Sequence, residues 1–163
     1  MSADLPAHFL RLHDYERWAT PRTLDALDTI PEPARSSPQA VRAAQVMAHV
    51  QLARRVWLAR LNDRVERPAD WFPAWPLPEL RAAAAEIDRA WGDYLRVLTP
   101  TALAQTFEYA SSDGQRFSNT VHDVLTHVFN HSTYHRGQVA RLVHECGGQR
   151  PSTDFIFFAR TPL

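Results

Sequence analysis

The sequence predicts an all-α protein, a four-helix bundle, from three observations. Four long stretches of the 163-residue chain repeat apolar residues at steps of three and four, which is the period of an amphipathic helix. Prolines, glycines and helix-capping residues separate these stretches. Each helix must bury one apolar stripe, and four helices do so by packing around a common core. At this length we expect one domain spanning residues 1–163.

The first two helices are expected at residues 5–29 and 38–61. Pro21 falls inside the first, where a proline removes a hydrogen bond and clashes with the preceding turn. A kink or break is therefore expected there, with Thr20 as a local cap. Ser37 before Pro38 is a favourable start for the second helix. The short connection predicts that the two helices run antiparallel.

The third helix is expected from residue 78 to just before Pro100. The connections on either side of it, at residues 63–77 and 101–118, are long enough to run the length of a bundle at up to ~3.3 Å per residue. The fold prediction therefore includes a long crossover connection. Three large aromatic residues lie in the first of these connections, so part of it should pack on the body or line an opening.

The fourth helix is expected from about residue 119 to Cys146, where two glycines follow. Thr120 and Asp123 have the spacing of a capping box at its start. The turn dipeptide at residues 113–114 lies between two short stretches rich in aromatic residues and predicts a small hairpin before this helix. A short final helix at residues 154–160 should cover the bundle with its aromatic side chains.

Composition excludes several classes of protein. The formal net charge is zero, which does not fit the basic surface of a nucleic-acid-binding protein. No run of about 18 apolar residues is present to span a membrane. Cys146 is the only cysteine, so no intrachain disulfide can form, and no signal peptide is expected. We therefore expect a cytoplasmic protein that acts on a small molecule and binds neither nucleic acid nor membrane.

Three histidines in the fourth helix, His127, His131 and His135, are four residues apart. On a helix, residues i and i+4 differ by only about 40° around the axis, so two imidazoles can point at one spot ~6 Å along it. His131 and His135 fill a gap in the apolar stripe, and His49 falls within the stripe of the second helix. Burying an imidazole without a partner costs roughly 1–3 kcal/mol, and one shared metal ion would supply a partner for all three.

Three neutral nitrogen ligands would leave at least one coordination position open, as in catalytic sites. The ion would keep its full positive charge and favour an anionic fourth ligand such as hydroxide or thiolate. Other metal motifs are absent, since the chain has neither a zincin motif nor any Glu-x-x-His sequence. The alternative is a plain helical bundle with packed histidines, because a single histidine on an apolar face is usually a core residue.

Several stretches together resemble one family. Residues 130–138 (NHSTYHRGQ) look like the signature of the DinB family of metal-binding four-helix bundles. Residues 47–50 (MAHV) with 55–61 (RVWLARL) resemble its second helix, residues 13–19 (HDYERWA) its first, and residues 151–155 (PSTDF) its closing segment. The resemblance covers nearly the whole chain. The sequence departs from the family at Thr20-Pro21, where the family usually has Asn and no proline.

The resemblance implies a bundle with a long crossover, a homodimer, and one divalent metal ion held by His49, His131 and His135. Zinc, nickel, iron or manganese would suit such a site, with a small thiol as cosubstrate. His127 matches a common family position that is not usually a ligand, so a role as an alternate ligand or as a hydrogen-bond donor to a ligand is the less favoured interpretation. Tyr134 and Arg136 flank the ligand positions, with packing or a salt bridge favoured over a role in a pocket.

Two functions follow from this site. Members of the family include thiol-dependent transferases, so the leading hypothesis is a metal-dependent enzyme that activates a thiolate or water, as an S-transferase or a hydrolase. The sequence names no catalytic residue beyond the metal ligands and no organic cofactor. The alternative is a non-catalytic, metal-stabilised dimer that serves as a binding or stress-response module. A site sealed by aromatic residues would favour that alternative.

Overall fold

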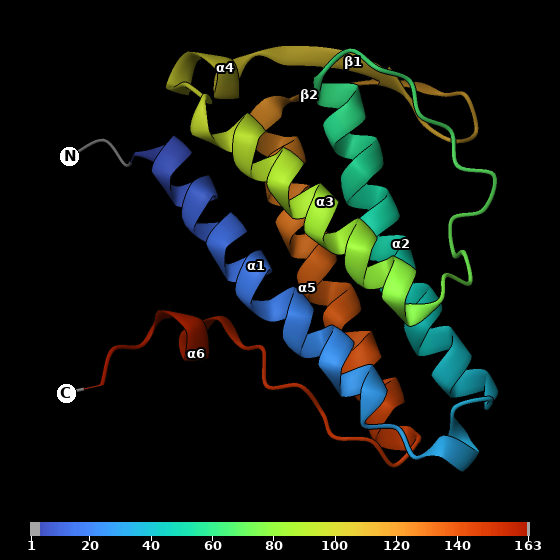
Figure 1. Ribbon diagram of the computed structural model, residues 1–163. Coiled ribbons are helices and arrows are strands. Elements are labelled where there is room, and N and C mark those ends of the chain that lie inside the picture. Colours follow the sequence, from blue (N-terminus) through green and yellow to red (C-terminus); the bar gives the residue numbers. More distant parts are fainter. Residues whose placement is uncertain (1–3, 163) are drawn as a thin grey trace.

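Four long helices lie side by side and form the body of the protein (Figure 1). The computed structural model describes residues 4–162. The long helices are α1 (Leu5–Asp28), α2 (Pro38–Leu61), α3 (Leu77–Arg96) and α5 (Val121–Glu145). The shorter elements are η1 (Glu32–Ala34), α4 (Pro100–Ala104), β1 (Thr106–Ala110), β2 (Arg116–Thr120) and α6 (Phe155–Ala159). Residues 1–3 and 163 lie outside the described residues, and the absence of a signal peptide, expected from the N-terminal sequence, concerns in part the first of these.

The helices follow the predicted bundle with a long crossover. Helix α1 packs on α3 and α5, and α2 packs on the same two helices, so α1 and α2 are diagonal neighbours with few shared contacts. Figure 1 shows α1 and α2 running antiparallel. The connection after α2 then runs back along the bundle, so α3 runs in the same direction as α2. Within residues 4–162, no helix is long and apolar enough to cross a membrane.

Helix α1 continues through Pro21, so the predicted break with Thr20 as a cap is wrong. Proline removes one hydrogen bond from the helix, but side chains strengthen the same turn. Arg22 Nη1 donates to the carbonyl of Trp18 at 2.9 Å, and Thr23 Oγ1 donates to the carbonyl of Ala19 at 3.0 Å. Packing of α1 against two neighbouring helices holds the segment helical despite the proline.

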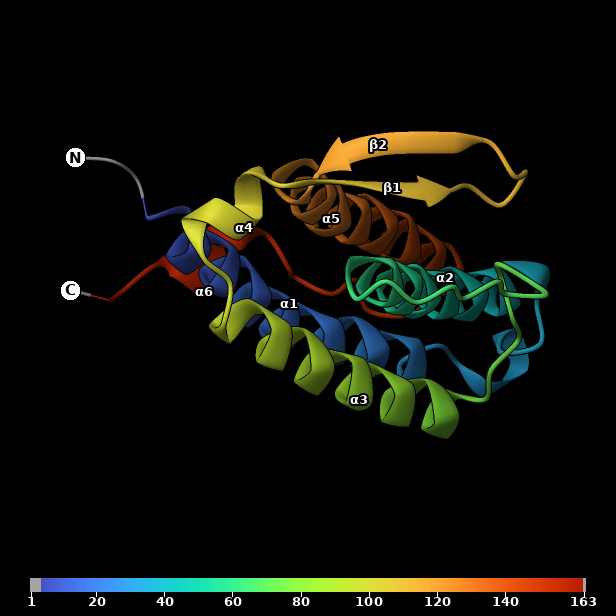
Figure 2. The ribbon, with the colours of Figure 1, turned by 90° about the horizontal axis from the view of Figure 1, so that it is seen from above.

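The predicted hairpin is present and leads directly into α5. Strands β1 and β2 pair antiparallel, with Thr106 opposite Thr120, and Gly114 in the turn has a positive φ of 85°. Both hydrogen bonds of the capping box between Thr120 and Asp123 are made. Because β2 extends to Thr120, α5 begins two residues later than expected. Figure 2 shows the hairpin lying across α5 and reaching towards α2.

Helix α6 forms where it was predicted but covers the bundle only in part. Phe155 and Phe158 pack against the ring of Tyr15 on α1, with centroids 5.2 and 5.8 Å away. Ile156 and Phe157 remain 62% and 36% exposed. A helix of one turn can direct only one face inward, so the other apolar side chains stay in solvent.

The core consists of two apolar clusters, one at each end of the bundle, with buried polar residues between them. We call His13, Glu16, Gln51, Arg54 and Arg136 the buried polar layer; each is at most 2% exposed. Along α1, for example, the layer lies between Phe9 of one cluster and Leu24 of the other. The histidines considered as ligands lie at the same height, because they are sequence neighbours of these residues on α2 and α5.

Candidate metal centre

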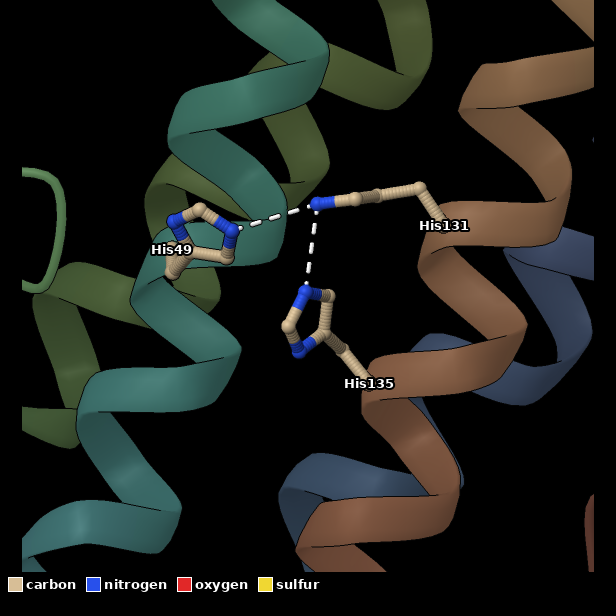
Figure 3. Close-up of side chains that lie close together, drawn as sticks. All are labelled: His49, His131 and His135. Carbon is tan, nitrogen blue, oxygen red and sulfur yellow. Dashed lines mark hydrogen bonds between the residues drawn. The ribbon is translucent and has the colours of Figure 1, made fainter.

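Three imidazoles from two helices meet between α2 and α5 (Figure 3). His131 and His135 are one turn apart on α5, and His49 faces them from α2. His131 Nε2 lies 3.2 Å from His49 Nε2 and 3.1 Å from His135 Nε2. The three ligand atoms all lie within 4.8 Å of one another, and all three residues are partly exposed. The structure thus brings together the three histidines proposed from the sequence.

In two of these rings the outer nitrogen, Nδ1, already makes a hydrogen bond, whereas the inner nitrogen, Nε2, faces the other histidines. His49 Nδ1 lies 2.9 Å from the carbonyl oxygen of Trp71, which can only accept a hydrogen bond. His135 Nδ1 lies 3.0 Å from Gln138 Oε1, also an acceptor. In a neutral ring the single proton is therefore on Nδ1, which leaves the Nε2 of His49 and of His135 with a free lone pair.

The surroundings keep these rings neutral. Burial lowers the pKa of His49 and of His135, and the hydrogen bonds at their Nδ1 atoms only partly oppose this. Burial, followed by the charges of the neighbouring histidines, lowers the pKa of His131 to about 3. Protons are therefore poor competitors for the three nitrogens at neutral pH.

The inner nitrogens cannot all be satisfied by one another. A neutral His131 has one proton, so its Nε2 can donate to His49 or to His135 but not to both. At least one of the two contacts near 3 Å then joins two lone pairs, which repel. A cation among the three nitrogens removes this conflict, because each lone pair becomes a ligand.

The spacing of the nitrogens fits such a cation. Metal–nitrogen bonds of about 2.0–2.1 Å give a nitrogen–nitrogen separation of about 3.3 Å at a tetrahedral angle, and about 2.9 Å at a right angle. The observed 3.1 and 3.2 Å fall between these values. Two of the three nitrogen pairs therefore already have the spacing of ligands that share one divalent ion.

Comparison with known proteins places the chain in a family. The family model described as DinB family matches residues 1–162. The chain belongs to the DinB family. It is similar to Protein DinB of Bacillus subtilis (strain 168), with 25% identity over 165 residues that cover 93% of this chain and 95% of the relative. Its fold is similar to that of a DinB-like protein from Bacillus cereus, with a TM-score of 0.65, 21% identity, and coverage of 88% of this chain and 94% of the other.

In this DinB-family protein, the crossover forms one wall of the centre. Besides the carbonyl of Trp71, the ring of Phe72 stacks on His49, with centroids 4.3 Å apart and planes 15° apart. The guanidinium of Arg42 lies over the Phe72 ring, 4.0 Å from its centroid. The expectation that part of this connection packs on the body is confirmed. Which atoms would touch His49 could not be predicted, because the loop has no periodic pattern.

His127 is not one of the three clustered histidines. Its ring lies against His131 and Trp57, with centroids 5.3 and 5.5 Å away. Within residues 4–162 it makes no hydrogen bond to the clustered histidines, and burial lowers its pKa. The structure thus gives it a packing position beside the centre, rather than the position of an alternate ligand or of a donor to one.

Tyr134 and Arg136 do not belong to the group of three histidines. Tyr134 is 66% exposed and packs its ring beside His135. Arg136 is buried on the opposite side of α5, where its Nη1 donates to Glu16 Oε1 at 2.6 Å. The salt bridge favoured from the sequence is confirmed for Arg136. Its partner was missed, although both residues belong to stretches that resemble the family.

Proposed function

We propose that this DinB-family protein binds one divalent metal ion through His49, His131 and His135. We further propose that it uses this ion to activate a thiol or a water molecule against a small electrophilic substrate. The observation that supports the proposal is the convergence of three Nε2 atoms that neutral imidazoles cannot satisfy among themselves. Zinc, nickel, iron and manganese are the candidate ions.

The three ligands carry no charge, so a bound ion would keep its charge and would lower the pKa of a coordinated water to about 7 or hold a thiol as thiolate. The protein's own part is to fix the rings. The carbonyl of Trp71 and the amide of Gln138 hold the Nδ1 protons, which sets the tautomers and the ring orientation. Phe72 and the bundle shield one side of the centre from water.

A metal-stabilised module without catalysis is the second candidate. It requires a centre that no substrate can reach. All three histidines are partly exposed, and the aromatic cover from the crossover lies on the His49 side. This accessibility favours the catalytic proposal.

The proposal is tested first by metal content and then by activity. Protein stripped with a chelator and reloaded with each candidate ion should bind one ion per chain. His135→Ala should lower the bound metal, whereas His144→Ala, at an exposed position in the last turn of the same helix, should not.

Metal-loaded protein is then incubated with small thiols and a monochlorobimane-type electrophile. We expect a rate above that of His135→Ala with at least one ion and thiol. Absence of bound metal would reject the centre itself. One bound ion per chain without any rate above that of His135→Ala would favour the binding module.

Homodimerisation, which the family resemblance implies, stays a prediction. The exposed apolar side chains of α6, Ile156 and Phe157, are the kind of surface that a second copy would cover. Sedimentation velocity at several protein concentrations measures this. A single species with the mass of one chain at all concentrations would contradict it.

A further inference from the structure

A cavity of about 280 Å³ opens beside the candidate metal centre. One wall is formed by the end of α2 and the start of the crossover, within residues 60–71. The other wall is formed by β1 and the turn that follows it, within residues 108–112. The hairpin thus does more than connect α4 to α5, because its first strand and turn line this cavity. Figure 2 shows the hairpin reaching towards α2.

One residue, Trp71, connects the cavity to the three histidines through its contacts with His49. Trp71 lines the cavity, its carbonyl contacts His49 Nδ1, and its ring lies 6.1 Å from the His49 ring. At the other end, Arg60 is eleven residues after His49 on the same helix, which is ~16 Å along the axis. A ligand that occupied the cavity and reached the histidines would therefore be elongated.

The acidic side chains around the cavity are largely neutralised. Glu66 is paired with Arg55, and Glu108 is paired with Arg116 on the facing strand. Among the residues that the structure describes, Asp63 is the one acid lining the cavity that makes no ion pair. The acids of the lining thus contribute about one uncompensated negative charge.

Over residues 4–162, more basic than acidic side chains of the lining lack an ion-pair partner. Arg60, Arg64 and Arg67 line the cavity, and within the described part of the chain none of them pairs with a carboxylate. Arg60 donates to the carbonyl of Ala110 at 2.9 Å and lies 5.0 Å from the centroid of the Tyr109 ring, which leaves its charge uncompensated. The cavity is therefore positive, with flat aromatic surface from Tyr109 at one end and from Trp71 near the histidines.

We propose that this cavity binds an organic anion with a flat aromatic body, whose charged group lies among Arg60, Arg64 and Arg67. The body packs along Trp71 and directs its far end to the three histidines. This inference rests on the proposed function and names its substrate class, an elongated aromatic compound that carries a carboxylate or similar anionic group. The aromatic side chains pack against a flat ring system, and the arginines select a ligand with negative charge.

The test compares 2-naphthoate with its neutral analogue 2-naphthamide, by calorimetric titration of metal-free and metal-loaded protein. Val65 lines the cavity and is 83% exposed, so Val65→Glu should place a negative charge at the rim without disturbing the fold. Val97, at the end of α3 and 77% exposed, is the matched control for the same substitution. Arg67→Gln removes one charge of the cavity, and Arg89→Gln removes an exposed charge on α3.

Wild-type protein should bind 2-naphthoate more tightly than 2-naphthamide, with or without metal. A unit charge about 6 Å away in a water-like medium changes affinity about three-fold. Val65→Glu and Arg67→Gln should each weaken 2-naphthoate binding by about this factor, whereas Val97→Glu and Arg89→Gln should not.

Three results would overturn the inference. They are equal binding of the two probes, equal effects of the test and control variants, and loss of 2-naphthoate binding on metal removal, which would place the anion at the histidines. Selective binding in a protein with no thiol activity would reject the proposed chemistry and leave the anion site in place. Thiol activity without selective binding would reject the anion site alone.

Discussion

The ion pair between Glu16 and Arg136 joins α1 to α5 in the middle of the bundle. The side chains of Glu16 and Arg136 are 1% and 2% exposed, and Arg136 Nη1 lies 2.6 Å from Glu16 Oε1. Burial by itself would lower the pKa of Arg136, but the carboxylate of Glu16 raises it. Glu16→Gln keeps the shape of the side chain and removes its charge, so a guanidinium is left buried without a counter-ion.

Breaking a buried pair in this way costs about 3–5 kcal/mol. We expect the lower end, about 3 kcal/mol, because Arg136 keeps its hydrogen bond to Thr133 Oγ1 and its place over the Tyr15 ring. For a chain of this length, that corresponds to a fall in Tm of about 6–12 °C. The measurement is urea unfolding of metal-free protein, followed by circular dichroism at 222 nm.

Glu145→Gln is the control, because Glu145 pairs with Arg141 at 2.7 Å on the surface. The side chain of Arg141 is 69% exposed and that of Glu145 is 41% exposed. That change should cost under about 1 kcal/mol. The double variant Glu16→Leu/Arg136→Met should recover most of the loss, since an apolar pair can replace a buried ion pair. The reasoning is refuted if Glu16→Gln costs no more than Glu145→Gln, or if the double variant is less stable than Glu16→Gln.

Three further predictions concern single side chains. Gln138→Ala removes the acceptor at His135 Nδ1 and should lower metal affinity about 10–100-fold, measured by competition with a chelating dye; unchanged affinity would show that the bond does not orient the ring. Burial, followed by the charge of the nearby Arg54, lowers the pKa of His13 from 6.5 to about 4. Above pH 6.5 the ring is neutral in both the folded and the unfolded protein, so it does not affect the unfolding free energy. As the pH falls from 6.5 towards 4, the unfolded protein takes up a proton that the folded protein does not, and stability is lost. Between pH 7 and pH 4, metal-free wild type should lose about 3 kcal/mol more unfolding free energy than His13→Gln, and parallel pH curves would contradict this. In Gly148→Ala the new Cβ would lie 2.7 Å from Val143 Cγ1, so the change should lower the unfolding free energy in urea by about 1–3 kcal/mol. A cost near zero would mean that the segment after α5 shifts freely to make room.

Features set by neighbouring residues could be predicted from the sequence. Apolar repeats located the four long helices, the spacing of Thr120 and Asp123 located the start of α5, and the turn dipeptide before Gln115 located the hairpin. The juxtaposition of His131 and His135 was predictable for the same reason, because one helical turn fixes their geometry. The place of His49 within the apolar stripe of α2 made it their proposed companion, and the family resemblance implied the same three ligands.

Contacts between segments distant in the chain required the folded structure. His49 and His131 are 82 residues apart, and only the packing of α2 on α5 places their nitrogens 3.2 Å from each other. The carbonyl of Trp71 at the His49 ring and the pairing of Glu16 with Arg136 depend on the same kind of packing. Local patterns set which residues a helix presents on one face, whereas the neighbour of that face depends on how all four apolar stripes are buried together. For the same reason Pro21 could be recognised as a helix breaker, but only the packing of α1 decided that the helix continues through it.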